Sequence, residues 1–267
     1  MNKIKSRKEN SGGAKEMRKY ILFIFVTQMM VACIGCEKDY LGYDIELWKD
    51  TEVWDFAKCI SKGKFEKAEK MLKDYSIDID FKDPKFGETL LFWAVFNDNI
   101  DAVKFLVDHG ANPNAHNTCN GTSPMVLAAS EFNSIEILKY LLEHGGNPND
   151  YVKENEVLSY GRKLETPLTG AAFISLEKTK MLVKAGGDLN FSVKPGRTAF
   201  FKAAISTRIE ILDYLLFNCK LDYKKTFTVT IKGDTLYLKE IMKNNPILHP
   251  NDSIIFKRIN EYLDSRY

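Results

Sequence analysis

The octet VDHGANPN at residues 107–114 returns as LEHGGNPN at 142–149 and, more loosely, as VKAGGDLN at 183–190. The copies start 35 and then 41 residues apart. Self-similarity at such a spacing is typical of chains built from small structural units, each of which buries its apolar face only against its neighbours. The octet therefore predicts a stack of repeated units rather than one globular core.

A second pattern recurs in register with the octets and reads GETLLFWA (87–94), GTSPMVLA (121–128), LETPLTGA (164–171) and GRTAFFKA (196–203). Its hydroxyl residue can cap a helix by accepting a backbone N–H, and a proline after it occupies the first turn, where no donor is missed. Its alanine is small enough to let a second helix pack closely. The hydroxyl residues are Thr89, Ser123, Thr166 and Thr198, and the alanines are Ala94, Ala128, Ala171 and Ala203.

Apolar residues at helical spacing follow each copy of this pattern, as in residues 135–142, and predict a second helix. Its end is marked by a glycine, which can adopt the left-handed conformation that terminates a helix. An Asn-Pro pair then favours an extended turn in two of the octets. The octet is thus a predicted helix end followed by a loop, and the terminating glycines are Gly110, Gly145 and Gly186.

These features resemble the ankyrin repeat, whose hallmark is G-x-T-P-L-H-x-A followed by a second helix and a Gly-Ala turn into a hairpin loop. The resemblance covers residues 84–223, and it implies an all-α repeat solenoid of helix-turn-helix units with hairpin loops. We expect about six repeats, including atypical end repeats that each cover one apolar face without a neighbour. The histidine of the hallmark is replaced by Phe92, Val126, Thr169 and Phe201. Its usual hydrogen bonds between repeats should therefore be absent, leaving apolar packing to carry more of the stacking.

The expected organisation is a leader (1–35), a short tether (36–50) and a repeat array (51–267). Repeats are placed near 51–81, 84–116, 118–149, 162–190 and 193–223, with an insert at 150–161 and a closing repeat at 233–267. Helices are expected near 53–61 and 65–74 in the first repeat, and near 234–243 and 253–267 in the last. The insert YVKENEVLSYGRK (151–163) is long enough to contact a partner. The alternation in KKTFTVTI (224–231) predicts an extended hairpin that supports the end unit.

The N-terminal residues predict export. Seven Lys and Arg lie within residues 1–35, and the apolar run 20–32 is too short to span ~30 Å of hydrocarbon but suits a secretory signal. Val31-Ala32-Cys33 and Ile34-Gly35-Cys36 resemble a bacterial lipobox, which implies lipidation of Cys36, with Cys33 as the alternative. This places the protein in the cell envelope, lipid-anchored to a membrane and facing the periplasm. An uncleaved membrane anchor and a buried helix are the alternatives, and Met17 is an alternative start that would leave residues 1–16 untranslated.

Charge and motif content argue against several functions. Beyond residue 35 the chain has 31 Lys and Arg against 34 Asp and Glu, so it lacks the basic surplus of a nucleic-acid binder. His109 and His144 occupy the same repeat position before a terminating glycine, which indicates a structural role. His116 and His249 have no neighbouring ligands at metal-binding spacing. We expect no enzyme activity, metal, cofactor or small-molecule substrate. We also expect no disulfide among Cys59, Cys119 and Cys219, of which Cys59 and Cys219 fall in helical apolar patterns.

By resemblance to ankyrin proteins, the concave face should bind another protein, through positions just before Gly-x-Thr and just after the small alanines. The apolar members of this set, if exposed, are typical of interfaces. The basic members at 162–163 and 194–197 suit an acidic patch on the partner. The predicted partner-binding residues are Lys85, Phe86, Glu88, Phe96, Asn97, Asn120, Thr122, Ser130, Glu131, Arg162, Lys163, Glu165, Phe173, Ile174, Lys194, Arg197, Ile205 and Ser206.

Non-catalytic protein binding at the envelope is the function that these features favour. The alternatives are an immunity protein that neutralises an envelope-targeted toxin, a structural spacer of the envelope, and an enzyme.

Overall fold

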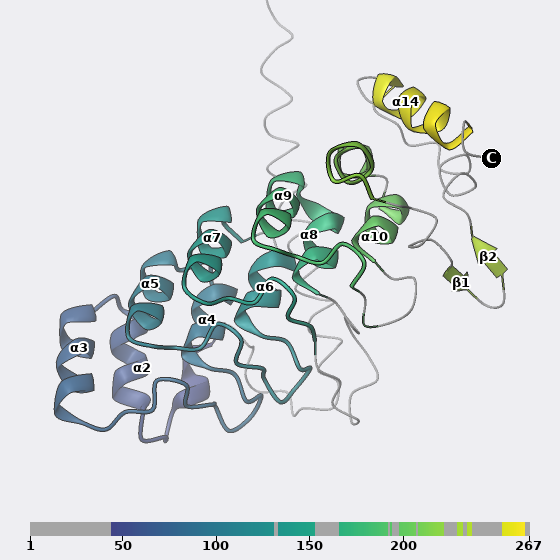
Figure 1. Cartoon of the computed structure of the whole chain (residues 1–267). Coiled ribbons are helices and arrows are strands. Elements are labelled where there is room, and N and C mark those ends of the chain that lie inside the picture. Colours follow the sequence, from purple (N-terminus) through teal and green to yellow (C-terminus); the bar gives the residue numbers. More distant parts are fainter. Residues whose placement is uncertain are drawn as a thin grey trace, which may run out of the picture.

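The computed structural model describes residues 44–130, 133–152, 166–191, 193, 198–206, 208–221, 229–231, 234–236 and 253–264. Over these residues, pairs of antiparallel helices stack side by side into a row that runs from the N-terminal to the C-terminal part of the chain (Figure 1). The predicted α-helical repeat solenoid is confirmed.

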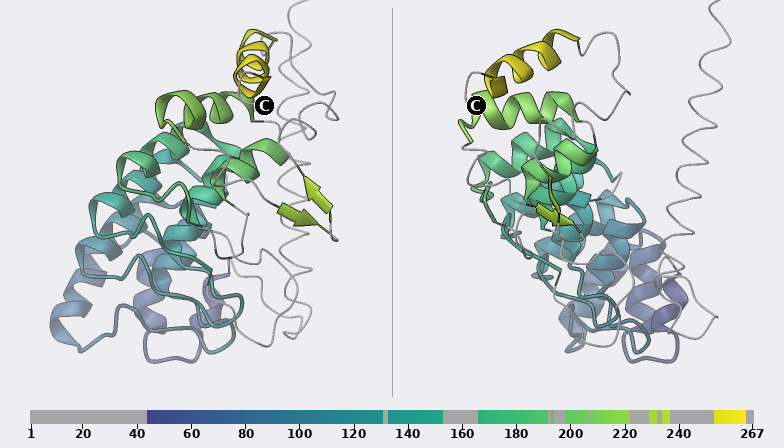
Figure 2. Two further views of the ribbon diagram at one scale, coloured as in Figure 1. Left: turned by 45° about the vertical axis from the view of Figure 1, so that its right-hand side comes forward. Right: turned by 90° about the vertical axis from the view of Figure 1, so that its right-hand side faces the viewer.

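The first helix of each pair lies in an inner row and the second in an outer row (Figure 1), and Figure 2 shows the same stack from two further sides. The inner helices are α2 (Trp54–Ser61), α4 (Leu90–Phe96), α6 (Pro124–Ser130), α8 (Pro167–Ile174) and α10 (Ala199–Ile205). The outer helices are α3 (Phe65–Asp74), α5 (Ile100–Asp108), α7 (Ile135–Glu143), α9 (Leu176–Lys184) and α11 (Ile209–Asp213), the last continued by a π-helical turn η2 (Tyr214–Asn218). The helices expected near 53–61 and 65–74 are α2 and α3.

Local side-chain chemistry sets where the inner helices begin. The Thr89 hydroxyl accepts the N–H of Phe92. The hydroxyls of Ser123, Thr166 and Thr198 each accept the backbone N–H of the residue three positions later. Such a bond satisfies a backbone donor that the first turn leaves without a partner. The outer helices end as predicted, because Gly110, Gly145 and Gly186 adopt φ angles of +93°, +91° and +92°.

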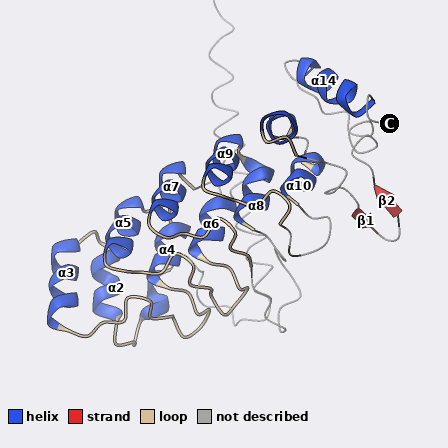
Figure 3. Ribbon diagram, viewed as in Figure 1, coloured by secondary structure: helices blue, strands red, loops and turns tan. Residues whose placement is uncertain are grey.

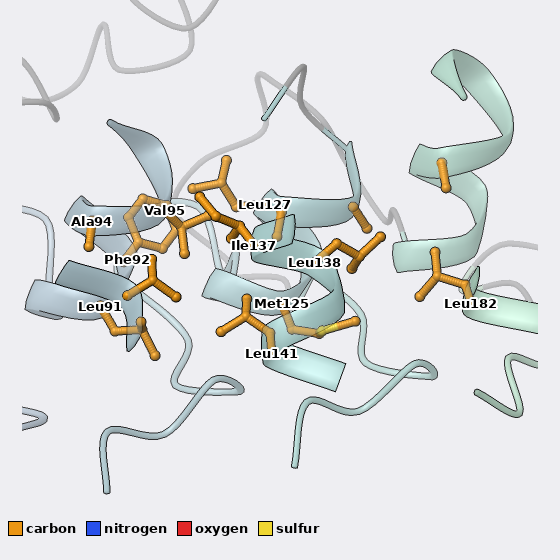
Figure 4. Packing of buried hydrophobic residues seen from close by; sticks show 14 of the residues in the cluster. Leu91, Phe92, Ala94, Val95, Met125, Leu127, Ile137, Leu138, Leu141 and Leu182 are labelled. Carbon is orange, nitrogen blue, oxygen red and sulfur yellow. The ribbon is translucent and has the colours of Figure 1, made fainter. Parts of the chain in front are cut away.

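The core is a continuous seam between the two rows. Ala94, Ala128, Ala171 and Ala203 are all at least 99% buried, and α6 packs between α4 and α8 while α8 packs against α10. Leu138 and Leu141 on α7 point into this seam beside Met125 on α6 (Figure 4). A side chain at Gly170 of α8 would lie 2.9 Å or less from atoms of Ser130 on α6, so glycine permits the close approach of these two helices.

Asparagine and aspartate side chains give the octet its recurring shape. Within each loop, a backbone N–H donates to the carboxamide or carboxylate two residues earlier, which closes an Asx turn. The acceptor–donor pairs are Asp78–Asp80, Asn112–Asn114, Asn147–Asn149 and Asp188–Asn190.

The second polar residue of the turn also reaches the next loop. The side chain of Asn114 donates to the carbonyl of Gly145 at 2.9 Å and accepts the N–H of Asn147 at 2.8 Å. One repeat later the same two bonds join Asn149 to Gly186 at 3.1 Å and to Asp188 at 2.7 Å. Successive copies of the octet are therefore joined by the same side-chain hydrogen bonds, which accounts for the repetition of the octet. Asn114 and Asn149 thus supply polar links between repeats, although the histidine of the ankyrin hallmark is replaced in this chain.

The two ends of the array differ from the sequence-based expectation. Ile45–Trp48, within the predicted tether, forms a short 3-10 helix (η1) that packs on α2 and buries Trp48 completely. At the other end, the expected helix near 234–243 is wrong at its start. Val229–Ile231 (β1) and Asp234–Leu236 (β2) pair as an antiparallel hairpin instead (Figure 3), while residues 237–243 lie outside the described part. The alternating apolar and polar residues of 224–231 predict a strand, and a strand requires a pairing partner. Asp234–Leu236 is that partner for Val229–Ile231.

The last described helix, α14 (Ser253–Asp264), covers the final repeat. It packs against α11, and the ring of Tyr262 meets Phe217 edge-on at 5.2 Å between centroids. The Arg258 guanidinium lies 3.8 Å from the centre of the Phe217 ring, and its Nε is 3.5 Å from Asp213. This matches the helix expected near 253–267 and the expected role of an end unit.

Candidate functional site

The C-terminal ends of four inner helices form a row along the array. Since α4, α6, α8 and α10 pack in succession, equivalent residues at their ends lie next to one another. Most of each inner helix is buried, so only these ends and the loops reach solvent. The predicted residues at the ends differ in exposure: Asn97 is exposed, and Phe96, Ser130, Ile174 and Ser206 are half-buried.

Two large apolar side chains in this row are exposed. Phe173 at the end of α8 is 39% exposed, and Ile205 at the end of α10 is 42% exposed. Phe173 lies beside two cationic side chains, because Lys202 Nζ is 5.8 Å from the centre of the Phe173 ring and Arg208 Nε donates to the Phe173 carbonyl at 3.0 Å. We call these four residues the Phe173–Ile205 patch. Phe96 and Ile174, predicted to join such a cluster, are partly covered, and Phe96 packs against the core.

The loop before α4 places two predicted contact residues inside the protein. The Asp83 carboxylate accepts the N–H groups of Lys85, Phe86 and Glu88 at 2.8, 2.7 and 2.5 Å, and so folds the loop into a tight turn. Burial raises the pKa of Asp83, although these bonds oppose the shift. Phe86 is 5% exposed and Glu88 is 7% exposed. The prediction that they offer contact surface is therefore wrong for both.

The next loop explains part of this burial, since the N–H groups of Thr118 and Cys119 both donate to the Phe86 carbonyl at 3.0 Å. Among the other loop candidates, Lys85 and Thr122 are half-buried and Asn120 is exposed. Six candidates lie outside the described residues, namely Glu131, Arg162, Lys163, Glu165, Lys194 and Arg197.

Side chains from the following repeat cap the inner helices at their C-termini. Asn133 donates to the Val95 carbonyl, Lys178 Nζ donates to the Ala128 carbonyl at 2.7 Å, and Arg208 makes the equivalent bond to Phe173. Each donor meets a carbonyl of the last helical turn, where the positive charge of Lys178 and Arg208 is also favoured. Burial lowers the pKa of Lys178 from 10.5 to about 8, although the charge of Asp98 acts in the opposite direction. This second set of links between repeats was not predicted, because its partners lie 35 to 50 residues apart in sequence.

A buried polar cluster joins Ser123, His116 and Asp150. The Ser123 hydroxyl donates to Asp150 Oδ2 at 2.5 Å, and His116 Nε2 is 3.0 Å from Asp150 Oδ1. Burial opposes ionisation of Asp150, but hydrogen bonds from His116 and Ser123 outweigh it and hold the pKa of this carboxyl below its ordinary value.

The three residue types are those of a hydrolytic triad, but the order of contacts is different. In a triad the histidine accepts the serine proton, whereas Ser123 is fully buried and bonds to the carboxylate. The cluster therefore links the loops. The residues near His116 were considered only as metal ligands, and its contact with Asp150, which is 34 residues away, was not predicted.

The other described histidines contact their own helices, at the positions from which the sequence predicts a structural role. His109 Nδ1 lies 2.7 Å from the Phe105 carbonyl and His144 Nδ1 lies 2.8 Å from the Tyr140 carbonyl, four residues back in each case. Each ring also packs on the aromatic ring of that residue. In the described part of the chain, no group of three or more His, Cys, Asp or Glu is placed to hold a metal ion. No helix there is both long and apolar enough to cross a membrane.

Comparison with known proteins agrees with the repeat geometry. The family described as ankyrin repeats (three copies) matches residues 56–152. One curated relative is transient receptor potential cation channel subfamily A member 1 of Homo sapiens, which is 38% identical over 74 residues. That match covers 28% of this chain and 6% of the human protein, so the chain spans a small part of the length of this relative. The two-helix units described above form an α-helical repeat solenoid, and residues 56–152 within it match ankyrin repeats.

Proposed function

We propose that this protein acts by non-catalytic protein binding, through the ends of its inner helices and the adjoining loops. Ankyrin repeats are generally protein–protein interaction modules, and the typical repeat has no catalytic role. The observation that carries the proposal is the exposure of Phe173 and Ile205 on neighbouring, otherwise buried helices. A rigid pair of apolar side chains can act as an anchor, because little conformational freedom is lost when a partner covers it.

The charge around this patch favours an acidic partner segment. Residues 166–221 contain eight Lys and Arg against four Asp and Glu, whereas residues 44–152 contain eleven against nineteen. Two of the eight, Lys202 and Arg208, contact Phe173 directly. We therefore expect the partner to place an apolar side chain on the patch and carboxylates around it.

The test is affinity capture from envelope extracts with the full chain, followed by measurement of the captured partner's affinity for variants. Truncation of an interface anchor costs about 1–2 kcal/mol or more, so Phe173→Ala and Ile205→Ala should each weaken binding roughly tenfold. Ile254→Ala is the matched control, since Ile254 is an exposed apolar residue on α14, away from the inner helices. Unchanged affinity in both patch variants would exclude this surface.

We also propose that the chain is lipid-anchored at Cys36, with Cys33 as the alternative, and faces the periplasm. The support is the lipobox-like sequence after a basic, apolar leader, and these residues lie outside the described part. Labelling with a radioactive fatty acid should mark the wild-type protein and fail to mark a Cys36→Ala, Cys33→Ala double variant. Retention of label in that variant would rule out both cysteines.

An immunity role is a narrower form of the same proposal, supported by the leader and the binding surface together. Capture of one toxin that the chain inhibits favours immunity, and capture of resident envelope proteins favours a scaffold. A spacer predicts that no partner depends on the patch.

A further inference from the structure

The ring of His116 lies between two oxygen acceptors from different parts of the chain. Nδ1 is 2.7 Å from the Gly121 carbonyl within its own loop, and Nε2 is 3.0 Å from Asp150 Oδ1 in the next loop. The His116 side chain is 13% exposed and that of Asp150 is 7% exposed. Water therefore has little access to replace either contact.

The two contacts together specify the protonation of the ring. A carbonyl oxygen can only accept, so Nδ1 must carry a proton. The Asp150 carboxylate is ionised near neutral pH and accepts the Ser123 hydroxyl on Oδ2, so Oδ1 is also an acceptor and the Nε2 contact is a hydrogen bond only when Nε2 carries a proton. The imidazolium satisfies both contacts, whereas each neutral tautomer directs a nitrogen lone pair at an oxygen.

His116 connects three successive hairpin loops through its backbone carbonyl and its ring. Lys82 of the preceding loop donates to the His116 backbone carbonyl at 2.7 Å, and Asp150 follows the next octet. Asp150 also accepts a hydrogen bond from the Ser123 hydroxyl, and that hydroxyl caps α6 by accepting the Val126 N–H. Lys82 and Asp150 are thus the charged groups that the flanking loops bring to His116, one to its backbone and one to its ring.

We propose that His116 and Asp150 form a pH-sensitive link between successive repeats, which is closed by the His116 imidazolium and weakened when the ring becomes neutral. The two ring contacts then stabilise the folded chain most where the ring is protonated. The folding equilibrium must therefore shift toward the unfolded state with rising pH, by at most about tenfold per pH unit for one proton. This link is independent of the proposed binding function.

The test is urea unfolding of the full chain between about pH 5.5 and about pH 7.5, where an ordinary histidine, at about 6.5, titrates. The wild-type folding constant should fall about threefold or more across this range. His116→Gln and Asp150→Asn should each remove most of this fall. His144→Gln is the matched control, because His144 bonds only to its own helix among the described contacts. It should keep most of the wild-type dependence.

Nitrogen NMR of the wild-type His116 ring provides a readout that requires no variant to fold. At about pH 6.5 both ring nitrogens should have imidazolium shifts while an unfolded histidine is half neutral. A neutral His116 at that pH overturns the proposal, and so does a His116→Gln protein with the full wild-type pH dependence.

Discussion

Replacement of Leu141 by Ala should lower the free energy of unfolding by ~2–5 kcal/mol. Leu141 is completely buried on α7 and points into the seam between the helix rows (Figure 4). Truncation removes apolar burial and leaves a cavity, because the helices on either side are held by further contacts and cannot close the gap. Leu106, also completely buried on α5, should behave in the same way.

The measurement is urea denaturation, with the midpoint compared at constant slope. Leu142→Ala is the matched control, since it changes the neighbouring residue on the same helix, where the side chain is half-buried. We expect a clearly smaller loss for Leu142. Equal losses at the two positions would contradict the seam as the main source of stability.

Raising the pH from about 8 to about 10 should stabilise the protein through Lys178, by on the order of 2 kcal/mol. Burial lowers the folded-state pKa of this amine from 10.5 to about 8. Between these two values the unfolded chain binds the proton and the folded chain has lost it, so the free energy of unfolding rises with pH. Below about pH 8 the cost of the buried charge is fully present.

Lys178→Met should abolish this rise in stability, and urea denaturation across the same pH range measures it. Lys180→Met is the control, because Lys180 is an exposed lysine on the same helix and should leave the rise intact. The raised pKa values of Tyr140, to about 12, and of Cys219 act in the opposite direction over this range, so only the difference between Lys178→Met and the wild type measures the lysine. A Lys178→Met protein that keeps the wild-type rise would show that another group causes it.

Much of the fold could be predicted because its signals are local. A hydroxyl that caps a helix, such as Thr89, acts on a donor three residues away. A glycine that ends a helix, such as Gly145, needs only its own φ angle. The period of the octet then implies stacking, because one two-helix unit cannot bury its apolar face alone.

The candidate surface was predicted less well, because exposure depends on neighbours. Phe86 and Phe173 both follow from the repeat pattern, yet the next loop covers Phe86 while Phe173 remains 39% exposed. The start of the helix expected at 234–243 was wrong for a similar reason, since Asp234–Leu236 forms a strand that pairs with Val229–Ile231.

The sequence by itself determined the repeat, the ends of most helices and the absence of a recognisable catalytic motif, because these depend on residues within a few positions of one another. Only the tertiary structure revealed the links between repeats. The Asn114 hydrogen bonds, the Lys178 cap and the His116–Asp150 pair join residues 31 to 50 positions apart. Side chains so distant in sequence can bond only after stacking has brought their loops together, and no local pattern specifies which of them will meet.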